Sequence, residues 1–104
     1  MPHVTVIAKL KAKPGLEKRV EKELERMVEE TQKEAGCINY DLHRHLDEAG
    51  TFLFHENWES AEALDKHMQT PHFLNLTKIV DEILSEPPEI SLFEKIRCSE
   101  PVRN

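Results

Sequence analysis

The chain has 104 residues, a hydrophobic content of 38% and a formal net charge of −6 at pH 7. This length predicts a single domain over residues 1–104, with a core at about 3–96 and a C-terminal tail at 97–104. No run of Lys and Arg stands clear of acidic neighbours, which excludes nucleic acid as an expected partner. The sequence has neither an apolar run of the roughly 20 residues that span a bilayer nor a secretory leader. We therefore expect a cytoplasmic protein with no membrane partner.

Hydrophobic periodicity predicts the first four elements. Alternation of apolar and polar residues predicts a strand over 3–11. Apolar residues then recur every three or four positions over 16–34, which predicts a helix with Gly36 as its C-terminal cap. Alternation returns over 37–45 and over 51–59, separated by an Asp-Glu-Ala-Gly turn. These two segments are therefore predicted to form a β-hairpin.

Capping residues predict two further helices, and alternation predicts the last strand. Ser60 is a favoured N-cap and predicts a short helix over 60–68. Thr70 and Pro71 predict the start of another helix, which ends before a pair of prolines. The alternating segment 90–96 predicts a fourth strand.

The order strand, helix, strand, strand, helix, strand predicts an α+β protein with the ferredoxin-like βαββαβ arrangement. Such a fold has a four-stranded antiparallel sheet with its helices on one face. Adjacent positions of the strands, such as Leu53 and Phe54, place apolar side chains on both faces of the sheet. We therefore expect the face away from the helices to be dry and to pack against a second copy, giving a homodimer.

Two of the six histidines lie at a distinctive place. His67 closes the short helix and His72 opens the next, so the break between them directs both towards the same space. In the first turn of a helix, His72 is expected to stay neutral near pH 7, as a general base must. The alternative is that His72 only caps or packs. We predict no metal at this pair, because its spacing matches no recognised ligand pattern and no third ligand is evident.

A carboxylate and several aromatic residues form the second group of candidates. Glu56 shares a strand face with Phe54 and Trp58, where a buried carboxylate needs a hydrogen-bond partner. It either positions a histidine or a substrate hydroxyl, or satisfies backbone N–H groups. Trp58 and Tyr40 either line a flat cavity for an aromatic ring or pack in the core.

The segment from Glu56 to Phe73 contains Glu-x-Trp-x-Ser, followed by His67 and by Thr-Pro-His. It resembles the antibiotic biosynthesis monooxygenase family, particularly its quinol-monooxygenase-like members. Supporting matches are Lys-Pro-Gly after the first strand, Glu34-Ala-Gly-Cys at the second, and Tyr40. The resemblance implies a dimeric α+β barrel with a pocket between sheet and helices. It also implies oxidation of phenols or quinols by O₂ without flavin, haem or metal, and so no cofactor.

The leading hypothesis is a cofactor-independent monooxygenase that oxidises a quinol or related phenolic small molecule with O₂. His72 or His67 acts as the base, and an apolar pocket is shaped by Trp58, Tyr40, Phe54 and Phe73. Two alternatives remain at this point. One is an isomerase or tautomerase of a small carbonyl metabolite, and the other is a non-catalytic dimer that binds a small ligand.

Overall fold

The computed structural model describes residues 3–99, so the part of the predicted tail at 100–104 lies outside the described residues. Four strands and three helices follow in chain order: β1 (Val4–Lys11), α1 (Glu17–Thr31), β2 (Cys37–Arg44), β3 (Thr51–Trp58), α2 (Ala61–His67), α3 (Pro71–Ile83) and β4 (Glu89–Phe93). None of the helices in this range combines the length and apolar character needed to cross a bilayer.

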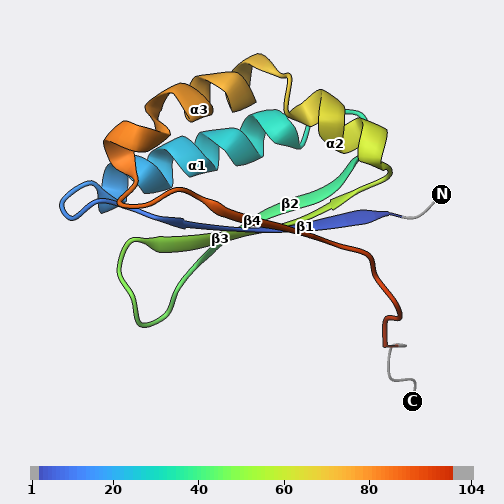
Figure 1. The fold of residues 1–104 in the computed structure, drawn as a ribbon, viewed down its shortest axis with the longest axis horizontal. Coiled ribbons are helices and arrows are strands. Elements are labelled where there is room, and N and C mark those ends of the chain that lie inside the picture. Colours follow the sequence, from blue (N-terminus) through green and yellow to red (C-terminus); the bar gives the residue numbers. More distant parts are fainter. Residues whose placement is uncertain (1–2, 100–104) are drawn as a thin grey trace.

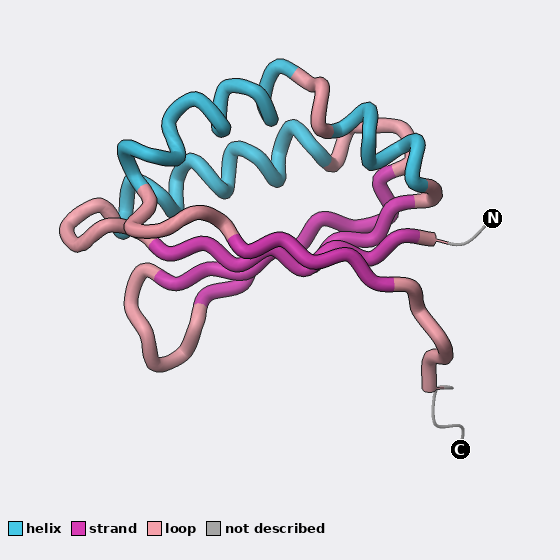
Figure 2. Tube along the Cα trace, viewed as in Figure 1, coloured by secondary structure: helices cyan, strands magenta, loops and turns pink. Residues whose placement is uncertain are grey.

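The strands form one antiparallel sheet in the order β2-β3-β1-β4. All three helices lie on the same face of this sheet, and the β2–β3 hairpin turn projects from the opposite side (Figure 1, Figure 2). The predicted ferredoxin-like α+β class is thus confirmed. The short helix predicted over 60–68 and the helix predicted to start at Thr70 and Pro71 appear as α2 and α3.

Capping side chains mark the starts of α2 and α3. The Ser60 hydroxyl accepts a hydrogen bond from the backbone N–H of Ala63 at 3.1 Å and thereby caps α2. The Thr70 hydroxyl accepts one from Phe73 N–H at 3.3 Å, and Pro71 occupies the first turn of α3. The two predicted caps are therefore confirmed, and the break between α2 and α3 is confined to residues 68–70.

The end of α1 differs from its prediction. The helix ends at Thr31 and not near residue 34, because the next backbone N–H groups bond three residues back, from Lys33 to Glu30 and from Glu34 to Thr31. Gly36 is consequently not the cap of this helix but belongs to the turn that follows. This early end removes Glu34 from the helix and places it in the turn that leads to β2.

The core lies between the helices and the even-numbered positions of β1 and β3. Phe52, Phe54 and Trp58 are buried on this face. Burial of large aromatic side chains contributes roughly 1.5–3 kcal/mol each, which makes β3 a major source of stability.

The opposite face of the sheet is more polar than expected. The Thr5 hydroxyl donates to Asn57 Oδ1 at 2.6 Å, and Asn57 Nδ2 donates to Asn39 Oδ1 at 2.8 Å. Asn39 Nδ2 donates in turn to Asp41 at 3.0 Å. The expectation of a face without polar contacts rested on apolar positions such as Leu53 and did not consider these polar side chains. A homodimer formed through this face stays a prediction.

Gly36 is expected to be sensitive to substitution. Its φ of 87° lies in the left-handed region, and an added Cβ would stand 2.6 Å from the Cβ of Ala63 on α2. We expect Gly36→Ala to lower the free energy of unfolding by roughly 1–3 kcal/mol, measured by chemical denaturation. Gly15→Ala is the matched control, because Gly15 has a φ of 88° with open space around it. Equal losses in the two variants would contradict the predicted clash.

Candidate functional site

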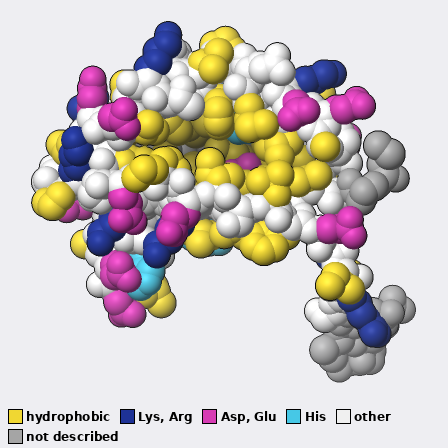
Figure 3. Space-filling view, viewed as in Figure 1, with side chains coloured by type: hydrophobic (Ala, Val, Ile, Leu, Met, Phe, Trp, Pro, Cys, Tyr) yellow, Lys and Arg dark blue, Asp and Glu magenta, His cyan; other side chains and the backbone are white. Residues whose placement is uncertain are grey.

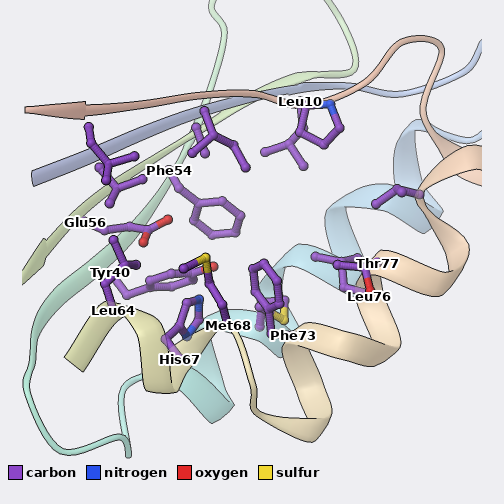
Figure 4. A pocket seen from close by; sticks show the side chains of 17 residues that line it. Leu10, Tyr40, Phe54, Glu56, Leu64, His67, Met68, Phe73, Leu76 and Thr77 are labelled. Carbon is purple, nitrogen blue, oxygen red and sulfur yellow. The ribbon is translucent and has the colours of Figure 1, made fainter. Parts of the chain in front are cut away.

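A cavity of about 270 Å³ lies between the helices and the sheet. Its mouth is a hollow lined by hydrophobic side chains on the face of the molecule shown in Figure 3. The cavity is lined by Val6, Ala8, Leu10, Met27, Tyr40, Phe54, Glu56, Leu64, His67, Met68, Phe73, Leu76, Thr77, Val80, Pro88, Ile90 and Leu92 (Figure 4). Only Glu56 and His67 among them are groups that titrate near neutral pH.

The open side of the cavity lies at the edge strand β4. Ile90 and Leu92 line the cavity yet remain 55% and 60% exposed. They pair with Ala8 and Val6 of the neighbouring strand β1, whose side chains are buried in the wall. The cavity therefore deepens from β4 towards β3 and the end of α2.

His67 is held at the deep end by aromatic neighbours. It is the last residue of α2 and is only 2% exposed. Its ring centroid lies 4.6 Å from that of Trp58, 5.1 Å from that of Phe73 and 5.4 Å from that of Tyr40. Figure 4 shows the ring projecting from the end of α2 towards the sheet. The imidazole thus has little freedom to rotate.

Glu34 bridges the two predicted histidines. Its Oε2 atom lies 2.8 Å from His67 Nδ1 and 2.6 Å from His72 Nε2. A carboxylate only accepts hydrogen bonds, so each of these two ring nitrogens carries a proton and donates. When the ring of His67 is neutral, its other nitrogen, Nε2, is therefore unprotonated. Glu34 selects the tautomer that leaves a basic nitrogen on His67.

The pKa of His67 is lowered by burial, because an apolar surrounding disfavours the imidazolium. The carboxylate of Glu34 opposes this effect through its hydrogen bond and charge, while His72 adds to the lowering. Burial is the largest of these influences. His67 is therefore neutral near pH 7 and able to accept a proton.

Glu56 is the second polar group of the cavity. It is 4% exposed, and its Oε1 atom accepts a hydrogen bond from Trp58 Nε1 at 2.9 Å. Burial raises the pKa of Glu56 to about 7, and the negative charge of Glu34 adds to this rise, while the bond from Trp58 opposes it. Trp58 contacts both His67 and Glu56, so these two groups lie at the same end of the cavity (Figure 4).

The structure brings most, but not all, of the predicted site residues to the cavity. Five of the seven line it: Tyr40, Phe54, Glu56, His67 and Phe73. Trp58 is fully buried and does not line the cavity, but it contacts two residues that do, His67 and Glu56. His72 lines a separate groove between α1 and α3, and Glu34 links it to His67. The two imidazoles thus share a carboxylate and not a cavity.

Glu34 is the residue that sequence reasoning about chemistry missed. It is separated from His67 by 33 residues, so no local spacing connects them. Its one signal was its place in the Glu-Ala-Gly-Cys stretch, which supported the resemblance without a role for the carboxylate. Glu34, His67 and His72 each offer one ligand atom, and these atoms lie within 4.8 Å of one another. Glu34 is therefore the third candidate ligand that was not evident from sequence spacing.

Comparisons with known proteins agree with this architecture. The sequence profile of the family described as "Antibiotic biosynthesis monooxygenase" matches residues 3–78. The chain is 34% identical over 89 residues to "Putative monooxygenase Rv0793" of Mycobacterium tuberculosis, covering 86% of this chain and 87% of that protein. It is 31% identical to an uncharacterized Synechocystis protein, sll1783, covering 88% of this chain and 62% of that protein.

Solved structures give the same result. The crystal structure of PA3566 from Pseudomonas aeruginosa superposes with a TM-score of 0.88 at 31% identity, covering 93% of this chain and 97% of that one. The structure of Rv0793 also superposes with a TM-score of 0.88, covering 94% of this chain and 99% of that one. This chain is a member of the antibiotic biosynthesis monooxygenase family.

Proposed function

We propose that this protein is a cofactor-independent monooxygenase that oxidises a quinol or related phenol with O₂. Family membership and the name of the relative Rv0793 support a monooxygenase-like function. The observation that carries the finer proposal is the buried His67, whose Nδ1 is held by Glu34 while its ring borders an apolar cavity. This arrangement provides a buried base at the deep end of an apolar cavity.

The proposed first step is removal of a phenolic proton by Nε2 of His67. The carboxylate of Glu34 stabilises the imidazolium that forms, as carboxylates do when they orient a catalytic histidine. The phenolate is left in an apolar cavity, where few water molecules hydrate it and its electrons are more easily lost. A direct reaction of this anion with O₂ then needs no other electron donor.

The overall reaction is balanced for a hydroquinone. One atom of O₂ enters the ring, the other leaves as water, and the product is a hydroxyquinone, with all electrons supplied by the substrate. In this proposal Glu56 holds a second oxygen of the substrate, which its position at the same end of the cavity as His67 supports. The volume of about 270 Å³ is near the lower limit of roughly 300 Å³ for ligand pockets, which favours a substrate of one or two rings.

The proposal is tested by oxygen consumption with a panel of one- and two-ring hydroquinones under ¹⁸O₂. We expect uptake that depends on the protein and one ¹⁸O atom in the quinone product. Formation of unlabelled quinone with hydrogen peroxide would indicate simple oxidation and contradict monooxygenation. Turnover of a carbonyl compound without oxygen would instead support the isomerase alternative.

A further inference from the structure

We propose that Glu34, His67 and His72 form a binding site for one divalent transition-metal ion, with Zn²⁺ as the representative ion. The donor atoms are Glu34 Oε2, His67 Nδ1 and His72 Nε2, all within 4.8 Å of one another. Two imidazole nitrogens and one carboxylate oxygen form a donor set that Zn²⁺ and its neighbours in the first transition row prefer. The site adjoins the cavity and shares His67 with it, whereas Glu34 and His72 do not line the cavity.

The spacing of the donor atoms is close to that of a coordination shell. Bonds of about 2.0–2.2 Å at angles between octahedral and tetrahedral separate two donors by roughly 3.0–3.5 Å. Glu34 Oε2 lies 2.6 Å from His72 Nε2 and 2.8 Å from His67 Nδ1. The two imidazole nitrogens lie within 4.8 Å of each other, so coordination requires the contacts with Glu34 to widen slightly and the two nitrogens to adopt a similar separation. His72 is the side chain with room to move, because it is the most exposed of the three and borders the groove between α1 and α3.

Charge also favours a cation here. Within residues 3–99, Glu34 forms ion pairs with no lysine or arginine, and its only ionic partners are the two histidines. The carboxylate side chain is only 13% exposed, so water screens it poorly. When both imidazoles are neutral, the cluster carries an uncompensated negative charge, which a divalent ion neutralises.

Coordination would change the hydrogen-bonding character of the cavity. An ion on Nδ1 of His67 takes the lone pair of that atom, so the neutral ring carries its proton on Nε2. The imidazole then offers the cavity an N–H donor and no longer a base. A bound metal ion would therefore prevent His67 from acting as a base. This consequence rests on the proposed function, whereas the metal site itself does not.

The experiment is a calorimetric titration of the metal-free protein with zinc chloride alone. We expect the wild-type protein to bind one ion per chain, and Glu34→Gln and His72→Gln each to weaken binding by roughly tenfold or more. His43→Gln is the matched control, because it removes an exposed imidazole of β2 that lies outside the cluster. This variant is expected to bind like the wild type.

The outcomes separate clearly. Absence of zinc binding by the wild type, or undiminished binding by both cluster variants, would overturn the metal site. His72→Gln keeps the test decisive if Glu34→Gln does not fold, because the side chain of His72 is partly exposed and carries little of the core. Since the titration measures binding and not turnover, its failure and a failure of the proposed oxygenase activity are distinguishable.

Discussion

Replacement of His67 by Gln is expected to lower the rate of oxygen consumption with a hydroquinone substrate by roughly 10²–10⁴-fold, the usual contribution of a general base. Gln retains a side-chain amide that can bond to Glu34 but has no nitrogen that accepts a proton near neutral pH. The fall should appear in kcat more than in KM, because proton removal follows binding. Steady-state oxygen electrode measurements on the wild type and the variant test this.

His72→Gln is the informative comparison for this prediction. His72 lies outside the cavity and is hydrogen-bonded to Glu34, the partner of His67. Its loss is therefore expected to lower the rate by about tenfold to a hundredfold, as for groups that orient another residue. Equal rates for the wild type and both variants would remove the two histidines from the mechanism. A larger loss in His72→Gln than in His67→Gln would assign the base to His72 instead.

The elements of this fold could be predicted because their signals are local. The alternation in β1 and β3 and the caps Ser60 and Thr70 act over a few residues, and the structure places all of them as expected. The end of α1 could not be placed in the same way. The last position of its apolar pattern is Thr31, and residues 32–34 fit a helix as well as a turn, so the sequence does not show that a tight turn replaces the helix there.

The site was predictable only in part for a related reason. The aromatic residues and histidines of the motif are close in sequence, so His67 and Glu56 could both be predicted as site residues. Their partner Glu34 comes from a turn far along the chain, and no spacing rule connects it with α2. Whether Trp58 faces the cavity or lies behind its wall depends on side-chain packing, which strand periodicity does not specify.

The two carboxylates near His67 differ in what surrounds them. Glu34 accepts hydrogen bonds from two imidazoles. Glu56 receives a single bond from Trp58 and is otherwise enclosed by apolar groups, so burial dominates and raises its pKa to about 7.

Glu56→Gln is expected to change how stability depends on pH. The folded protein holds the Glu56 proton more tightly than the unfolded chain, with a pKa of about 7 against an ordinary value of 4.5. The folded state therefore binds more protons between these values, and the contribution of Glu56 to stability is present below pH 4.5 and is lost as the pH rises to about 7. The loss amounts to about 3 kcal/mol at pH 8.

The Gln variant cannot ionise, but its side-chain oxygen can still accept the hydrogen bond from Trp58. We therefore expect the variant to gain about 3 kcal/mol relative to the wild type between pH 4.5 and pH 8, measured by urea denaturation at each pH. Glu62→Gln is the control, because Glu62 is exposed in the first turn of α2. A stability difference between Glu56→Gln and wild type that stays constant over this range would show that Glu56 ionises normally. The carboxyl would then be a charged group throughout, and it could not donate a hydrogen bond to a substrate oxygen at neutral pH.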